Sequence, residues 1–280
     1  MAAISAAAVK ALRDKTGAGM MDCKRVLTDA DGDLDKAVEL LRERGLAKAG
    51  KREGRATSEG LIVISLAGSV GGMLELGCET DFVARTDDFS DLAKSLADAV
   101  AGDAAINGPA ALLEHEIGGE RVADRVAAAI SKLGENVVVK RVARLAANGG
   151  YVGGYVHAGG KLGVLVGLDS AGGDAEVLSK DLAMHVAAAD PSPVAVRRED
   201  MSADVLESER KIYRAQAEQE GKPEKVIERI VEGKLKKYLS EVVLLEQAFV
   251  KDPDKAVKDL LGDVGVTGFE RFKLGETGEA

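Results

Sequence analysis

Apolar residues recur at helical spacing through the first 45 residues and predict three short helices. We expect the first over about residues 5–15 and the second over about residues 20–30. In the third, Asp33 is the expected N-cap, apolar residues follow at i, i+3, i+4 and i+7, and Gly45 is the expected C′ residue. Such a bundle has a marginal core and suits a docking module.

After a basic stretch at residues 48–55, typical of a flexible linker, the apolar residues follow the shorter period of strands. Runs at residues 61–66 and 73–76, with a Gly- and Ser-rich turn between them, predict a β-hairpin. An amphipathic helix is predicted from Asp87 onwards and another over about residues 122–133. A strand over residues 136–145 completes this part of the chain.

The same order then recurs, which predicts an internal duplication. Residues 151–157 and 162–167 form a second expected hairpin, and a helix follows that ends near residue 186. Both helices carry the pattern L-A-x-x-V, at Leu96 and at Leu182. The halves differ in length, with 19 residues from Gly77 to Leu96 but 15 from Gly167 to Leu182. The extra residues fall in the loop around residues 80–84, and added loop length is where binding function is commonly placed.

A polar helical hairpin interrupts the second half. Pro191 and Pro193 end the preceding helix, and the next is expected over about residues 203–220. A return helix follows the turn that ends at Pro223, so the pair should protrude as an antiparallel coil. Strands are expected again near residues 241–249 and 266–272.

The predicted fold class is therefore α+β: a small N-terminal three-helix bundle, then a duplicated α+β core with an inserted antiparallel helical hairpin. The expected divisions are a ubiquitin-associated-like three-helix module with its basic linker at 1–55, a first core subdomain at 56–148, a second at 149–275 with the hairpin at about 195–237, and a short tail at 276–280.

Charge argues against a nucleic-acid partner. The chain has 38 Lys and Arg against 47 Asp and Glu, a net charge of −9, whereas phosphate binding needs clustered cations. One short basic cluster exists, and it has no interleaved aromatic residue, which favours a solvated linker over an RNA contact. Its members are Lys48, Lys51, Arg52 and Arg55.

The sequence has no apolar run of about 18 residues and no N-terminal signal-peptide pattern, so we expect no membrane partner and a cytoplasmic location. Cys23 and Cys78 lack C-x-x-C or metal-ligand spacing and are expected to be free thiols. The sequence has no phosphate-binding G-x-x-x-x-G-K-[ST] loop, and no cofactor is predicted.

Carboxylates that could hold a metal or act as acid and base gather near Cys78. They are Glu75, Glu79, Asp81, Asp87 and Asp88. Asp87 and Asp88 are explained by a helix N-terminus, which favours negative charge. Cys78 lacks a nearby base, so a buried structural cysteine is favoured over a nucleophile. The histidines, at positions 115, 157 and 185, are expected to be packing or surface residues.

Phe82 has two interpretations. It lies between Asp81 and Arg85, before a helix whose apolar face already has Phe89 and Leu92. It could tuck back as a loop anchor, or it could be a wedge that gains about 1.5–3 kcal/mol when buried in a partner. Similarly, the adjacent Met20 and Met21 cannot both face one core, so one should reach outward as contact surface.

Four segments together resemble the bacterial elongation factor Ts family. They are residues 16–24 (T-G-A-G-M-M-D-C-K), 78–84 (C-E-T-D-F-V-A), 184–188 (M-H-V-A-A) and 266–269 (V-T-G-F). They stand in the family's order and extend over nearly the whole chain. Family members of the best-known type continue into a C-terminal helix, whereas this sequence stops at Ala280.

The resemblance implies a nucleotide-exchange factor for the GTPase elongation factor Tu, without covalent catalysis. Asp81 and Phe82 match the pair that pushes between GTPase helices and disturbs the magnesium and phosphate site, while the N-terminal module docks nearby. The hairpin resembles the family's protruding coiled coil, and a homodimer or a 2:2 complex is left open. The partner-binding residues implied are Met20, Met21, Lys24, Thr80, Asp81, Phe82, Val83, Leu133, Gly134 and His157.

Two other functions remain open on the residues alone. The acidic loop with Cys78 could be a metal or thiol site of an enzyme. Alternatively, the N-terminal bundle could tether another chain, as a ubiquitin-associated-like adaptor does.

Overall fold

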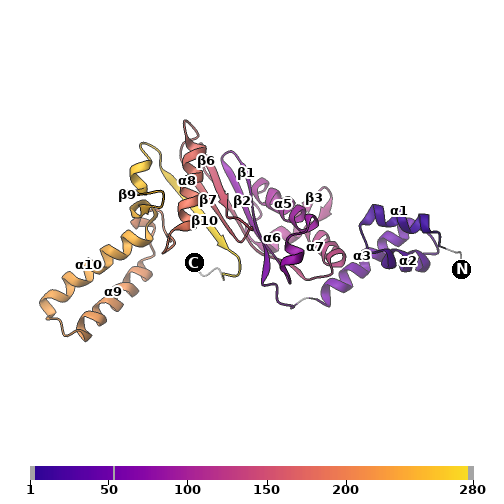
Figure 1. Ribbon diagram of the computed structural model, residues 1–280, viewed down its shortest axis with the longest axis horizontal. Helices are drawn as coiled ribbons and strands as arrows, with labels where there is room; N and C mark the ends of the chain where they lie inside the picture. The colour runs from indigo at the N-terminus through magenta and orange to yellow at the C-terminus, as the bar shows by residue number, and fades with distance from the viewer. Residues whose placement is uncertain (1–3, 53, 277–280) are drawn as a thin grey trace.

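A computed structural model describes residues 4–52 and 54–276 of the chain. The molecule is elongated, with a helical module at the N-terminal end, a central sheet-containing core, and a helical hairpin at the other end (Figure 1). This arrangement agrees with the α+β class expected from the sequence.

The N-terminal module consists of α1 (Ala6–Thr16), α2 (Met20–Asp29) and α3 (Leu34–Gly50). Ser5 and Asp33 cap α1 and α3, because their side-chain oxygens accept backbone N–H groups that have no partner within the helix. The apolar faces of the helices close on a small core whose buried members include Val9, Leu12, Cys23, Val26 and Leu27.

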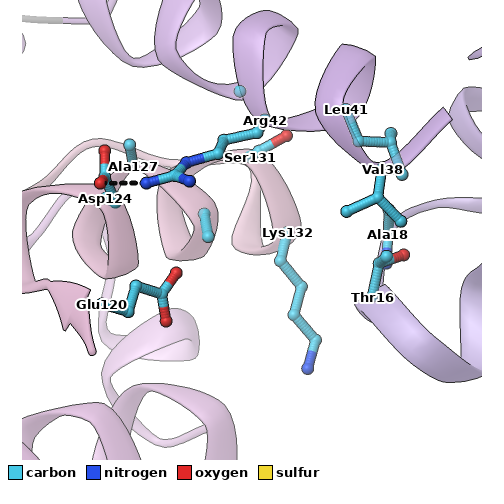
Figure 2. A pocket seen from close by; sticks show the side chains of 12 residues that line it. Thr16, Ala18, Val38, Leu41, Arg42, Glu120, Asp124, Ala127, Ser131 and Lys132 are labelled. Atoms are coloured by element: carbon cyan, nitrogen blue, oxygen red, sulfur yellow. Dashed lines mark hydrogen bonds and ion pairs between the residues drawn. The ribbon is translucent and has the colours of Figure 1, made fainter. Parts of the chain in front are cut away.

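Gly45 does not end the third helix, so that prediction is wrong. α3 continues to Gly50, and Gly45 is buried where α3 packs against α7 (Val122–Leu133). A Cβ at Gly45 would lie 3.7 Å from Cβ of Ser131, so the glycine marks a close approach of two helices. Beside this contact lies a cleft of about 290 Å³, where Arg42 of α3 forms an ion pair with Asp124 of α7 (Figure 2).

The first half of the core is a three-stranded antiparallel sheet with helices packed on it. Its strands are β1 (Glu59–Ala67), β2 (Val70–Cys78) and β5 (Val137–Ala146), in the order β1-β2-β5. A Cβ at Gly72 of β2 would lie 2.6 Å from the Ala97 carbonyl oxygen, so this glycine lets α5 (Asp87–Gly102) pack directly on the strand. The other elements are α4 (Asp81–Ala84), α6 (Pro109–Glu114), α7 and a small hairpin of β3 (Glu116–Ile117) and β4 (Glu120–Arg121).

The second half repeats this topology, as the predicted duplication requires. Its strands are β6 (Tyr151–Val156), β7 (Leu162–Leu168) and β10 (Val266–Lys273), with β7 in the centre as β2 is in the first half. Both of the leucines in the repeated pattern, Leu96 of α5 and Leu182 of α8 (Ala175–Ala188), are fully buried. The first-half connection, residues 79–86, is longer than its counterpart, residues 169–174, and it contains the helical turn α4.

The hairpin consists of α9 (Ala203–Gln219) and α10 (Glu224–Val242), preceded by η1 (Arg198–Asp200). It is held by a thin apolar seam that includes Ala217, Ile227 and Val231. Within the part of the chain that the structure describes, no helix is both long enough and apolar enough to cross a membrane.

The strand predicted near residues 241–249 is mostly wrong. α10 extends to Val242 and η2 (Leu244–Glu246) follows, so only β8 (Ala248–Phe249) is a strand, paired with β9 (Asp252–Ala256) before η3 (Val257–Leu260). Val243 and Leu244 are fully buried at the end of a helix, and a short apolar run does not distinguish this arrangement from a buried strand.

The position of Gly45 inside α3 generates a stability prediction. Gly45→Ala should raise the free energy of unfolding by about 0.5–1 kcal/mol, because alanine restricts the unfolded chain and the added methyl group fits against α7. Gly17→Ala is the matched control, since Gly17 ends α1 at φ +66°. It should lower stability by about 1 kcal/mol, the cost of a side chain in the left-handed region. Thermal unfolding of the full chain measures both, and a similar loss in both variants would contradict a helical Gly45.

Candidate functional site

The turn α4 presents Phe82 to solvent. Thr80 precedes it in an extended conformation and caps it, since its hydroxyl accepts the Val83 N–H at 3.4 Å. Val83 and Ala84 are buried in the first-half core, whereas Phe82 is 81% exposed. The interpretation of Phe82 as a loop anchor is therefore wrong, because its two successors anchor the turn and its own ring points outward.

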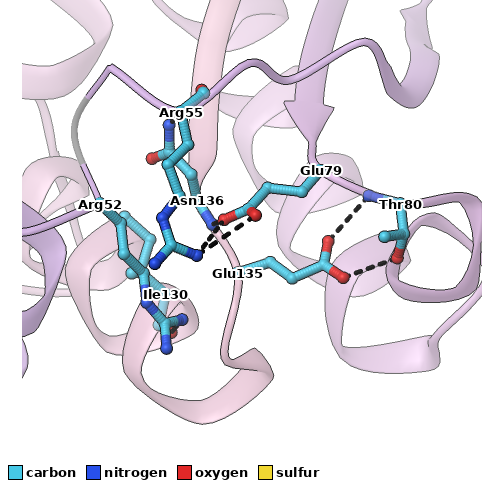
Figure 3. A network of polar contacts seen from close by, with 7 residues as sticks. All are labelled: Arg52, Arg55, Glu79, Thr80, Ile130, Glu135 and Asn136. Carbon is cyan, nitrogen blue, oxygen red and sulfur yellow. Dashed lines mark hydrogen bonds and ion pairs between the residues drawn. The ribbon is translucent and has the colours of Figure 1, made fainter.

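Two carboxylates tie this turn to the chain that enters β5 (Figure 3). The β2–β5 ladder ends at the pair Cys78–Val137. Just beyond it, the Thr80 N–H and hydroxyl donate to the two carboxylate oxygens of Glu135 at 2.9 and 2.6 Å. In the other direction, the Asn136 N–H donates to Glu79 at 2.7 Å. The start of α4 is thereby fixed relative to the end of α7.

Two arginines of the stretch predicted as a flexible linker, Arg52 and Arg55, bond to the same part of the core. Arg55 pairs with Glu79 at 3.4 Å, and the Asn136 side chain donates to the Arg55 carbonyl oxygen at 3.1 Å. Arg52 donates to the Ile130 carbonyl oxygen of α7 at 3.3 Å (Figure 3). The pKa of Glu79 is lowered, first by the Asn136 N–H and then by Arg55, because both favour the ionised carboxylate. Arg52 and Arg55 thus have partners within the core.

Leu133 and Gly134 lie beside the turn, as the C-terminal end of α7. Gly134 ends the helix at φ +83° and its N–H donates to the Ile130 carbonyl oxygen at 3.1 Å. Leu133 is half-buried and Gly134 is exposed, and the next residue is Glu135. Glu135 and Asn136 are not among the site residues expected from the sequence, and their one local signal is their position between a helix-ending glycine and a strand.

His157 lies at the same end of the core, in the turn between β6 and β7. Its ring is exposed, and its Nδ1 is 2.9 Å from the Tyr155 hydroxyl. This turn contacts β1, since Lys161 pairs with Glu59 at 2.7 Å. Glu59 in turn pairs in register with Cys78, next to the α4 turn. The sheets therefore bring His157 to the edge that carries Phe82.

Met20, Met21 and Lys24 lie on the separate N-terminal lobe. Met20 is 59% and Met21 is 64% exposed, so both methionines reach outward where one was expected to do so. With Lys24 and residues of α1 they line a groove of about 500 Å³. The predicted site residues thus form two groups, one at the edge of the core and one on the module.

The acidic residues near Cys78 do not converge on one point. Glu75 is buried and paired with Arg141, Asp81 pairs with Arg85, and Asp88 pairs with Lys132. Among the residues that the structure describes, no group of three or more His, Cys, Asp or Glu side chains could hold a metal ion.

Cys78 is buried, as predicted, and its Sγ donates to the Thr80 carbonyl oxygen at 3.1 Å. Burial, and then the Glu135 carboxylate, raise the pKa of this thiol to about 11. His185 is also a packing residue, since it is fully buried and its ring is 3.0 Å from Gln247 Oε1. Neither side chain is placed for nucleophilic chemistry.

Comparison with known proteins identifies the family. A family model described as Elongation factor TS matches residues 79–276. The elongation factor Ts of Chlorobium phaeobacteroides is 46% identical over 291 residues, covering 98% of this chain and 100% of that protein. Those of Alkalilimnicola ehrlichii and Clostridium acetobutylicum are 46% and 43% identical, each covering 98% of this chain and 93% of the relative. These similarities define a translation elongation factor. The chain belongs to the elongation factor Ts family.

The raised pKa of Cys78 predicts an unreactive thiol. At pH 8, alkylation of Cys78 by iodoacetamide in the folded protein should be about 100-fold or more slower than that of glutathione, because so little thiolate is present. The rate should rise with pH as the thiolate forms towards a pKa of about 11. Mass spectrometry of the Cys78 peptide measures this, with guanidinium-unfolded protein as control. Fast alkylation of the folded protein near neutral pH would reopen the enzyme hypothesis.

Proposed function

We propose that this protein is a guanine-nucleotide exchange factor for elongation factor Tu and acts in the cytoplasm. Membership of the elongation factor Ts family supports the partner and the reaction. One observation carries the mechanism: Phe82 is 81% exposed on a turn whose neighbours are buried and hydrogen-bonded. A large apolar side chain held away from its own core is suited to burial in a partner.

In this mechanism Asp81 and Phe82 insert next to the nucleotide and magnesium site of the GTPase. Met20, Met21 and Lys24 dock the N-terminal module on the same GTPase. Thr80, Leu133, Gly134 and His157 complete the contact surface at the edge of the core, while the buried Val83 anchors the turn beneath it.

Exchange needs no bond-breaking group. The factor lowers the barrier to release by binding the nucleotide-free GTPase more tightly than the loaded one. By reciprocity, a new nucleotide weakens the factor's own binding by the same amount, so the complex separates once the GTPase is reloaded. What such a protein requires is a rigid wedge and docking faces.

Phe82→Ala should lower the rate of GDP release at saturating factor by about tenfold or more, because the wedge loses its buried apolar area. Stopped-flow release of a fluorescent GDP from elongation factor Tu measures this. The variant should stay folded, since the ring is 81% exposed. Val177→Ala, which truncates another exposed apolar side chain (61%) on α8, is the matched control and should behave as the wild type. Unchanged acceleration by Phe82→Ala would remove Phe82 from the mechanism.

The double variant Met20→Ala/Met21→Ala tests docking by the module. It should raise the factor concentration that gives half-maximal acceleration by about tenfold or more, since two exposed apolar contacts are lost. The rate at saturation should stay close to that of the wild type, because the wedge is intact. A lowered maximal rate with unchanged half-saturation would contradict this division between docking and insertion.

A further inference from the structure

The turn that carries Phe82 is too short to hold its own shape. α4 contains four residues, Asp81–Ala84, and forming a single helical turn is unfavourable because few hydrogen bonds offset the ordering of the backbone. Burial of Val83 and Ala84 fixes one side of the turn, but it does not fix how the chain enters it. The direction of Phe82 therefore depends on the residue before the turn, Thr80.

Thr80 has a bonding partner for each of its polar groups. Its N–H and hydroxyl donate to Glu135, and the hydroxyl oxygen also accepts the Val83 N–H. Its carbonyl oxygen accepts from Cys78 Sγ at 3.1 Å and from the Ala84 N–H at 3.3 Å. The Glu135 carboxylate is the one partner in this set that comes from a distant part of the chain, 55 residues away.

We propose that Glu135 is a positioning residue for nucleotide exchange: its carboxylate accepts two hydrogen bonds from Thr80 and so sets the positions of Asp81 and Phe82. The inference rests on the proposed function of Phe82 as the wedge. Hydrogen bonds to a carboxylate are stronger than those between neutral groups, and its two acceptor oxygens fix the orientation of Thr80 as well as its distance. Glu135 follows Leu133 and Gly134, so the same anchor sets the distance between the wedge and that part of the contact surface.

Glu135→Ala should lower the rate of GDP release at saturating factor by about tenfold or more, because a hydrogen-bonded charged group is lost from the anchor. The factor concentration that gives half-maximal acceleration should change little, since the N-terminal module still docks. Glu135→Gln is the conservative variant, because its amide oxygen can accept the Thr80 N–H and its amide NH₂ can donate to the Thr80 hydroxyl. It should keep the rate within about threefold of the wild type. An equal loss in both variants would show that charge, not position, matters, and would overturn the inference.

A double-mutant cycle separates positioning from general destabilisation. If Glu135 acts through the turn, Glu135→Ala should have no further effect on GDP release in the Phe82→Ala background. A loss of the same size in both backgrounds would overturn the inference. Glu246→Ala, which removes a carboxylate that binds Arg198 in the other half, is the matched control and should leave GDP release unchanged.

Amide hydrogen exchange tests the anchor without the GTPase. In Glu135→Ala, the Val83 and Ala84 amides, which bond to Thr80, should exchange about tenfold faster or more, while the amides of α5 and β2 keep their protection. Unchanged protection at Val83 and Ala84 would overturn the positioning role. If instead Phe82→Ala leaves GDP release unchanged, the proposed function fails, and this exchange measurement still decides whether Glu135 holds the turn.

Discussion

The edge of the core that carries the candidate site is held by two carboxylates, whose hydrogen bonds link two neighbouring segments of the chain. Glu135 accepts hydrogen bonds from the N–H and hydroxyl of Thr80, and Glu79 accepts one from the N–H of Asn136, just beyond the end of the β2–β5 ladder. Without them, the turn would be joined to the core mainly by its two small buried side chains, Val83 and Ala84, and by the weak hydrogen bond from Cys78 Sγ to the Thr80 carbonyl oxygen. A wedge on a loose turn would lose conformational freedom when it entered a partner, and that loss would offset part of the stabilisation that the inserted ring gives. A turn that is fixed in advance avoids most of this cost.

The rigidity of that edge derives from the duplicated core behind it. Ile62 and Met73 of the first sheet pack with Val152, Leu165 and Phe272 of the second in one apolar cluster. A polar link reinforces the junction, since Arg141 pairs with the buried Glu75, stacks 4.3 Å from the centre of the Phe272 ring, and donates to the Lys273 carbonyl oxygen. His157 comes from the second half and Phe82 from the first, so their spacing depends on this junction between the sheets.

The local sequence pattern was enough to predict an element where a helix has one clear apolar stripe or a hairpin has a Gly-rich turn. Examples are α5, α7 and the β6–β7 pair. It failed at Gly45, because a glycine near the end of an apolar stripe is equally consistent with a helix end and with a close helix–helix contact. Phe82 stood out in the sequence because the next helix already had its apolar face. Glu135 did not, because its bond to Thr80 depends on the antiparallel pairing of β2 with β5, whose register shifts between Glu75 and Leu76. A single sequence does not reveal that shift, so it does not reveal the partner.

Packing and hydrogen bonds join the N-terminal module to the segment that carries Phe82, and this connection sets the distance between the two parts of the candidate site. α3 packs along α7, and the chain that follows it bonds to the end of α7 through Arg52 and to Glu79 through Arg55. The same Glu79 holds Asn136, next to the anchor of the turn. A docking face on a free tether would add affinity for loaded and nucleotide-free GTPase alike, and equal affinity for two states shifts nothing between them. In the proposed mechanism, a docking face held at a set distance from Phe82 also brings the wedge to the nucleotide site in the same complex, so that the affinity contributed by Met20 and Met21 is used to place Phe82.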